Sequence, residues 1–167
     1  NHCTFCITRI ARGGKRSIPV EQVLSDAQAA QKGGVNEIVL SGVHLGSWGS
    51  DFAKPLHLYQ LIEAILRNTD IPRVRLSSLE PWDLNDAFLG LWDNPRMCRH
   101  MHLPLQSGSE TVLRRMARKT TPDSFARLVA QARIVASEMA ITTDLIAGFP
   151  GETAAEFAEG LEFVEQM

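Results

Sequence analysis

Two cysteines, Cys3 and Cys6, give the start of the sequence its most reactive pair of side chains. A C-x2-C pair can bind zinc, act as a dithiol switch, or supply part of the ligand set of an iron–sulfur cluster. A zinc ribbon needs a second such pair or paired histidines downstream, whereas Cys98 stands alone. A thioredoxin-like motif opens a helix, whereas a loop rich in glycine and basic residues is expected here over 7–17. The spacing therefore indicates metal or redox chemistry and leaves its kind open.

Length, composition and charge favour one globular domain in a reducing compartment. The chain has 167 residues, of which 44% are hydrophobic and 22% charged, as in an ordinary soluble domain. A formal net charge of −2 excludes a global attraction to nucleic acid, so any such contact has to be local. Three cysteines are too few and too odd in number for a disulfide-stapled secreted fold, so we expect a cytoplasmic protein. We expect no membrane contact, because the sequence shows neither a signal peptide nor an apolar run of about 18–20 residues.

Hydrophobic periodicity predicts that helices and strands alternate along the chain. Apolar residues with a 3.6-residue period mark the helices, and the stripe of one of them runs from Phe125 to Val135. Ser109, Thr121 and Thr153 are placed to cap three helices. Helices are expected at 20–32, 55–68, 84–94, 110–118, 122–135 and from 154 onward, and strands within 36–46, 73–81, 99–109 and 140–152.

This order predicts right-handed βαβ units and a parallel sheet. A full eightfold barrel needs about 250 residues, so the choice lies between an open sheet and a partial barrel. Arg73, Arg75, His100 and His102 alternate with apolar residues along two expected strands. Covering both faces of the sheet with helices would bury unpaired charge, which is costly, so we favour a partial TIM-type (β/α) barrel with one wet face. The alternative, for Arg73 and His100 above all, is that these positions lie at strand starts and reach solvent. We expect residues 1–167 to form a single domain.

Six segments in a fixed order carry a family resemblance: CTFCI, ARGGKRS, EIVLSGVHLG, RLSSLEP, HLPLQSGS with RRMARKTT, and TTDLIAGFPGET. Together they resemble the radical S-adenosylmethionine (SAM) enzymes, and within these the methylthiotransferases, over essentially the whole chain. The resemblance implies that superfamily's core, a partial α/β barrel, truncated here at both ends. One departure is the stretch TRIARG, where the family commonly has IPYARG.

The resemblance also implies the cofactors. The superfamily's cluster motif is C-x3-C-x2-C; Cys3 and Cys6 match its second and third members, and the first would fall two residues before Asn1. We therefore expect Cys3 and Cys6 to bind a 4Fe-4S cluster whose open iron binds SAM, with an incomplete ligand set in this chain. One-electron cleavage of SAM would yield a 5′-deoxyadenosyl radical that takes a hydrogen atom from the substrate. The chain would be the central piece of a longer enzyme, with a second 4Fe-4S cluster in a domain absent here.

Three of the motifs carry residues that the resemblance places near SAM. Phe5 resembles the aromatic residue that contacts the adenine. Gly42 and His44 lie in SGVHLG, where the superfamily binds the amino group of SAM; the alternative is a flexible loop. Ser78 and Glu80 in SSLEP follow a strand, where barrel sites gather; the alternative for Glu80 is a solvated loop carboxylate.

Two later motifs complete the expected SAM site. Gln106 and Ser107 in LPLQSGS have hydrogen-bonding groups suited to the ribose hydroxyls or the methionine carboxylate, whereas Ser109 is expected to be only an N-cap. Gly148 in AGFPGET would let the backbone approach the adenine closely, and a tight turn with a capping residue is a compatible interpretation.

The substrate implied by the resemblance is tRNA. Arg12 and Arg16 follow the cluster loop and are expected to contact RNA phosphates. The loops SGVHLGSWGSD and SSLEP look most like the branch that adds a methylthio group at C2 of threonylcarbamoyladenosine beside the anticodon. Branches acting on isopentenyladenosine or on an aspartate of a ribosomal protein are the alternatives, and a noncatalytic zinc- or RNA-binding module is the alternative of another class. Cys98 and His57 are expected to be structural.

Overall fold

The structure is a computed structural model that describes residues 3–167. Helices and strands alternate along most of it, as predicted. Short 3₁₀ helices lie at Leu45–Ser47, Pro81–Asp83 and Gly90–Asp93. The longer elements are α1 (Thr8–Arg12), α2 (Val20–Lys32), β1 (Glu37–Leu40), α3 (Leu58–Asn68), β2 (Arg73–Leu76), α4 (Asp86–Leu89), β3 (His100–His102), α5 (Glu110–Arg115), α6 (Pro122–Val135), β4 (Ala140–Thr142) and α7 (Ala154–Glu165).

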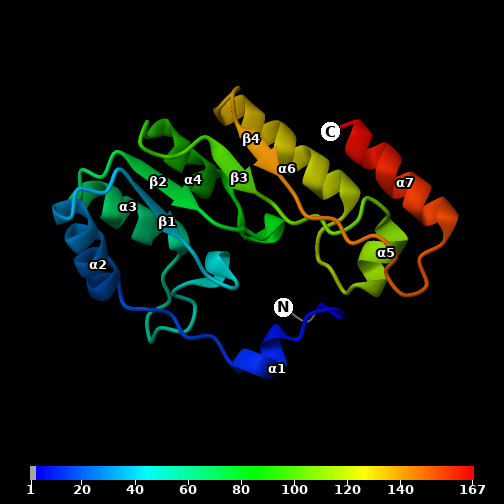
Figure 1. The fold of residues 1–167 in the computed structure, drawn as a ribbon, viewed down its shortest axis with the longest axis horizontal. Helices are drawn as coiled ribbons and strands as arrows, with labels where there is room; N and C mark the ends of the chain where they lie inside the picture. The colour runs from blue at the N-terminus through cyan, green and yellow to red at the C-terminus, as the bar shows by residue number, and fades with distance from the viewer. Residues whose placement is uncertain (1–2) are drawn as a thin grey trace.

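The four strands lie side by side in chain order and run parallel, which confirms the predicted βαβ arrangement (Figure 1). β1 pairs with β2 from Glu37 opposite Arg73 to Leu40 opposite Leu76, and β3 pairs with β4 over three residues. β1–β2 and β3–β4 form separate two-stranded sheets, and an isolated parallel bridge joins Val74 of β2 to Met97, three residues before β3. The strands therefore form an arch, a partial (β/α) barrel, with α1 on its open side (Figure 1).

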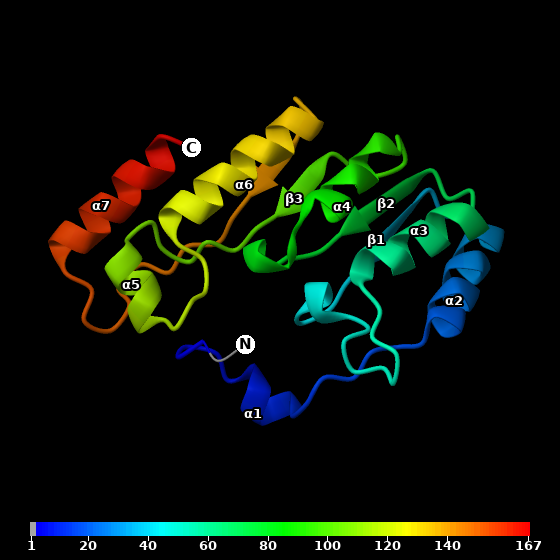
Figure 2. The same cartoon turned by 180° about the vertical axis from the view of Figure 1, so that it is seen from behind.

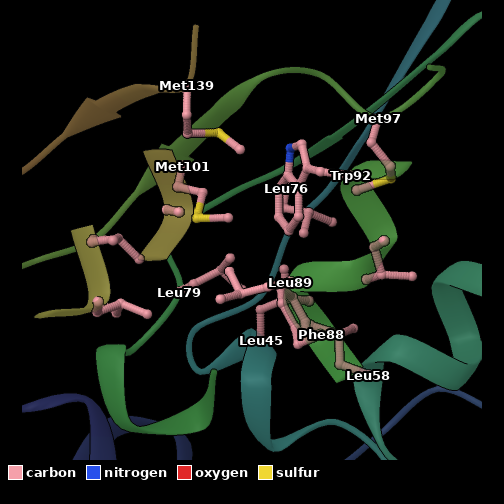
Figure 3. Packing of buried hydrophobic residues seen from close by; sticks show 14 of the residues in the cluster. Leu45, Leu58, Leu76, Leu79, Phe88, Leu89, Trp92, Met97, Met101 and Met139 are labelled. Atoms are coloured by element: carbon pink, nitrogen blue, oxygen red, sulfur yellow. The ribbon is translucent and has the colours of Figure 1, made fainter. Parts of the chain in front are cut away.

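One face of the strands is covered by helices. Viewed from behind, α3, α4 and α6 lie in front of the strands, whereas in Figure 1 the strands lie in front of them (Figure 2). Leu76 of β2 and Met101 of β3 are almost fully buried against Phe88 and Trp92 of the 86–93 segment (Figure 3). Burial of each such side chain contributes about 1.5–3 kcal/mol, so this apolar layer holds the arch together.

The other face of the strands is polar. Arg73 and Arg75 alternate with the fully buried Val74, and both guanidinium groups pair with Glu37 of β1, at 2.7 and 2.5 Å. His100 and His102 alternate in the same way with Met101 in β3. Successive side chains of a strand point to opposite faces, so these residues line the face that has no helices, as the sequence predicts.

The predicted helix caps are confirmed where the capping residue and its partner are close in sequence. Thr121 and Thr153 each form a capping box, with Ser124 and Glu156 respectively. Ser109 stands at the N-cap position of α5, but its hydroxyl makes no cap hydrogen bond and instead donates to Glu159 of α7 at 2.7 Å. The prediction that Ser109 is only an N-cap is therefore wrong, because a partner 50 residues away takes its hydroxyl.

Four other expectations are corrected. The loop expected over 7–17 contains the short helix α1, and the helix expected over 84–94 is α4 followed by a 3₁₀ turn. Val135 is 38% exposed and does not belong to the buried stripe of α6, because it lies at the end of that helix. The strands are shorter than their segments, since most of each segment is a loop. Within residues 3–167 no helix has the length and apolar character needed to cross a membrane.

The apolar layer can be tested with two isoleucines that differ in burial. Ile62 in α3 is fully buried, whereas Ile134 in α6 is 83% exposed. We expect Ile62→Ala to lower the free energy of unfolding by about 2–5 kcal/mol, because it leaves a cavity. Ile134→Ala, the matched control, should change it by less than about 0.5 kcal/mol. Urea unfolding followed by circular dichroism measures both; equal losses would contradict the assignment of the core.

Candidate active site

The cysteine segment docks on the turn that follows α5. The backbone N–H of Thr4 donates to the carbonyl of Met116 at 3.1 Å, and its hydroxyl donates to the carbonyl of Arg115, also at 3.1 Å. Cys3 is half-buried and Cys6 exposed, and both are free thiols. These contacts hold the predicted cluster loop beside the loops that leave the strands.

The hydrogen bonds of Cys6 favour its thiolate form over what a free cysteine would show. Its sulfur lies 3.1 Å from the hydroxyl oxygen of Thr8. Hydrogen bonds from the side chain and backbone of Thr8 lower the pKa of Cys6, and only slight burial and the charge of Glu80 oppose them. Because the thiolate is the form that binds metal, the local geometry favours metal binding at this position.

A buried arginine, Arg118, connects the cysteine segment to the loops after β2 and β3. Its side chain is only 2% exposed and its guanidinium lies 2.9 Å from the carboxylate of Glu80. The same group donates to the carbonyl of Pro104 at 2.6 Å and lies 3.8 Å from the sulfur of Cys3. It also stacks over the ring of Trp82, 4.6 Å from the ring centroid. Arg118 thus brings Cys3 and Glu80 together.

The loops after β1 and β2 are joined by His44. Its Nε2 lies 2.6 Å from the carboxylate of Asp83, and both side chains are about one-fifth exposed (20% and 19%). Gly46 packs so closely on Asp83 that a Cβ there would overlap the Asp83 side chain. Only glycine fits, so the loop carrying Gly42 and His44 is fixed against the loop carrying Glu80. Gly42 and Ser78 are both exposed.

The loop after β3 contains a strained residue. Gln106 has φ +77°, in the left-handed region that favours glycine. Its N–H donates to the carbonyl of Asp144 at 2.9 Å, and its carbonyl accepts from Ile146 at 2.8 Å. Strain of this kind gathers at functional sites. Ser107 is buried, and its hydroxyl accepts from the N–H of Ser109 at 3.1 Å.

Gly148 forms the tight turn that the sequence allows. It has φ +73°, is exposed, and donates its N–H to the carboxylate of Glu152 at 2.5 Å. The ring of Phe5 is also accessible, with 39% exposed. Both positions are open to a ligand.

The basic residues expected to contact RNA lie in α1 and the segment after it, outside the loops described above. Arg12 ends α1 and Arg16 follows it, and both are exposed. Lys15 and Ser17, between and after them, fasten the segment to Ser50 and Asp51 of the loop after β1. The arginines therefore lie on the open side of the arch.

Sequence reasoning missed Trp82, Asp83 and Arg118. Each lies in or close to a motif in the sequence, but only Arg118 belongs to a visible pattern, the basic run RRMARK, whose other basic members are exposed. Among residues 3–167 no three histidine, cysteine or acidic side chains converge on a metal position. Cys3 and Cys6 therefore offer two ligands, not a full set.

The polar face adds a hydrogen-bonded histidine pair below these loops. His100 Nε2 lies 2.9 Å and His102 Nδ1 3.0 Å from the hydroxyl oxygen of Thr142, and His102 Nε2 lies 3.2 Å from the carboxylate of Asp144. Partial burial, and then the charges of Arg75 and His102, hold the pKa of His100 below its usual value.

Comparison with known proteins gives one family over nearly the whole chain. A model described as the Radical SAM superfamily matches residues 1–164. A relative from Thermotoga maritima named threonylcarbamoyladenosine tRNA methylthiotransferase MtaB is 42% identical over 100% of this chain and 38% of its own length. A protein of the same name from Bacillus subtilis is 40% identical over 99% of this chain and 37% of its own. A tRNA-2-methylthio-N(6)-dimethylallyladenosine synthase from Caldicellulosiruptor saccharolyticus is 36% identical over the whole chain.

The chain therefore spans little more than a third of the length of these relatives. Among solved structures, the cobalamin-dependent S-adenosylmethionine radical enzyme OxsB with aqua-cobalamin bound matches 98% of this chain and 24% of its own. The TM-score is 0.72 at 17% identity, so this likeness concerns the fold alone.

The lowered pKa of His100 predicts how stability depends on pH. An unfolded chain takes up a proton on this histidine near pH 6.5, while the folded protein resists it. The contribution of neutral His100 to the stability of the folded protein is therefore complete above about pH 6.5. It is lost as the pH falls toward the lower pKa that His100 has in the folded state. Thermal unfolding of the wild type and of His100→Asn between pH 5 and 8 checks this. The difference in melting temperature should change with pH below about 6.5; parallel curves would contradict it.

Proposed function

Because the chain belongs to the radical SAM superfamily, we propose that it is the core of a methylthiotransferase that modifies tRNA in the cytoplasm. The substrate in this proposal is threonylcarbamoyladenosine beside the anticodon, which receives a methylthio group at C2. The relatives at 42% and 40% identity carry names of that activity, and the loops SGVHLGSWGSD and SSLEP resemble the same branch. In this proposal residues 1–167 act as one core domain of a larger enzyme.

The observation that carries the proposal is the docking of the cysteine loop beside the loops at the carboxyl ends of the strands. Barrel enzymes build their sites at this end. The loop brings a thiol of lowered pKa, Cys6, and a half-buried thiol, Cys3, which lies 3.8 Å from a guanidinium nitrogen. A cation beside Cys3 and a lowered pKa at Cys6 suit a negatively charged iron–thiolate centre.

The two thiols fit two of the three protein ligands of a 4Fe-4S cluster that keeps one iron open for SAM. We propose that a thiolate from outside the 167 residues completes the set, and that a second cluster lies in another domain. When bound, such a cluster supplies one-electron chemistry to SAM. The protein's own groups hold, orient and shield the reactants.

The exposure and contacts of the proposed SAM-binding residues support their assignment. The exposed ring of Phe5 and the open backbone at Gly148 suit a flat adenine. Gly42 and His44 lie in the loop after β1, where Asp83 orients His44.

The polar groups of two further loops would bind the rest of SAM. Ser78 and Glu80 follow β2, and in this proposal the carboxylate of Glu80, oriented by Arg118, accepts from amino or hydroxyl groups of SAM. Gln106 offers its side-chain amide from a backbone held by Asp144 and Ile146 of the loop after β4, and Ser107 lies buried in the same loop.

A second substrate, dimethylallyladenosine in tRNA, is favoured by the relatives of that name, which are 36% and 34% identical over the whole chain. Both candidates are hypermodified adenosines, so they differ in the group attached to the base. Mass spectrometry of tRNA nucleosides separates them.

The assignment of the cysteines predicts a contrast between two variants of the complete protein. Cys98 precedes β3, at the opposite end of that strand from the site, and serves as the control. After anaerobic reconstitution, Cys6→Ser should lose the iron held by this site, and methylthiolation of tRNA should fall below detection. Cys98→Ser should keep both within about twofold, a change within about 0.4 kcal/mol. Methylthiolation retained by Cys6→Ser would refute the proposal, and equal losses in both variants would refute the assignment of ligands.

The exposed arginines predict the salt dependence of tRNA binding. We expect Arg12→Ala and Arg16→Ala each to weaken binding and to reduce the slope of log affinity against log salt by about 1, because each removes one phosphate contact. Arg133→Ala on the outer helix α6 is the control and should leave the slope unchanged. Fluorescence titration at several salt concentrations measures this. Equal slopes for Arg12→Ala, Arg16→Ala and the wild type would place the RNA elsewhere.

A further inference from the structure

Arg118 places a charged guanidinium group in the interior of the site, and the burial of this charge requires an explanation. Its side chain is 2% exposed, and its Nε is buried without a hydrogen-bond partner among residues 3–167. An arginine stays protonated at every physiological pH. A buried and incompletely satisfied cation is costly, so a solely structural connection at this position would be better served by a neutral group.

The backbone before Arg118 is also strained. Ala117 has φ +55°, in the left-handed region that favours glycine, and the turn is closed by the N–H of Arg118 donating to the carbonyl of Leu113 at 3.0 Å. This is the turn on which Thr4 of the cysteine segment docks, through Met116 and Arg115. The strained turn therefore fixes the arginine and the cysteine segment to the same few residues.

The charges around Cys3 have a definite polarity. A guanidinium nitrogen of Arg118 lies 3.8 Å from the sulfur, whereas the balancing carboxylate of Glu80 lies 2.9 Å from the other terminal nitrogen. Trp82 covers the guanidinium with its ring, and Lys119 lies 5.8 Å from the centroid of the same ring. The positive end of the pair thus lies at the sulfur, in a place with little water to screen it.

We propose that Arg118 is a positioning residue that holds the Cys3 loop and favours the reduced state of the iron–sulfur cluster bound there. This inference rests on the proposed function, because it requires a cluster on Cys3 and Cys6. When a cluster takes up one electron from a low-potential reductant, it gains one negative charge and no bond to the protein is made or broken. The fixed positive charge of Arg118 stabilises that added charge, so it raises the reduction potential.

The test is a reductive titration of the complete protein after anaerobic reconstitution, without SAM, followed by electron paramagnetic resonance. At a fixed ambient potential, Arg118→Gln should lower the ratio of reduced to oxidised cluster about tenfold, a shift of about 59 mV for one electron. Arg118→Lys keeps the charge and should change the ratio less than about threefold, while a chelator should remove iron faster because the fork of hydrogen bonds is lost. Arg114→Gln, on the exposed side of α5, is the control and should titrate like the wild type.

Glu80→Gln supplies a second measurement of opposite sign. It removes the negative charge that opposes Arg118, so the ratio of reduced to oxidised cluster should rise about threefold or more. If Arg118→Gln holds no cluster, the direction of this shift decides the question. Unchanged potentials in Arg118→Gln and Glu80→Gln would overturn the role of Arg118 and leave the proposed function intact. A wild-type protein that binds no cluster in this site would overturn both.

Discussion

The parallel arrangement of β1 to β4 in chain order, paired as β1 with β2 and β3 with β4, is the constraint on which the rest of the structure depends. Since all four strands run in one direction, the loops that follow them emerge at one end of the arch. That end collects Glu80, Gln106 and Gly148, which are far apart in the sequence. The cysteine segment reaches the same end because it docks on the turn after α5. The strand register therefore determines how accurately the side chains of this site are placed relative to one another.

The two faces of the arch have different energetic tasks. The helix-covered face supplies stability through Leu76, Met101 and their apolar neighbours, which are excluded from water. The open face carries charge and must limit the cost of partial burial, so Arg73 and Arg75 share the carboxylate of Glu37. Because the helix-covered face supplies the stability, the open face can present polar groups to a ligand. A barrel enzyme needs this division between its two faces.

Arg118 shows how one buried polar side chain can connect several loops of this fold. It contacts loops from three parts of the chain and a tryptophan ring, and it does so beside the thiol of Cys3. In the radical SAM superfamily the cofactor performs the radical chemistry, so the protein contributes placement and electrostatics. The second polar connection, His44 with Asp83, fixes the neighbouring loop in the same manner. Both are side-chain contacts between loops, where the backbone ladder provides no order.

The sequence by itself determined the alternation of helices and strands, the parallel arrangement, the alternating polar face, the helix start at Thr121 and the capping box at Thr153. These depend on periodicity and on partners three residues away, so local order suffices to predict them. Tertiary structure alone decided that Ser109 donates to Glu159, that His44 pairs with Asp83, and that Arg118 lies at Cys3. These partners are separated by 50, 39 and 115 residues, and pairings at such distances depend on how the strands bring their loops together, which no local pattern records.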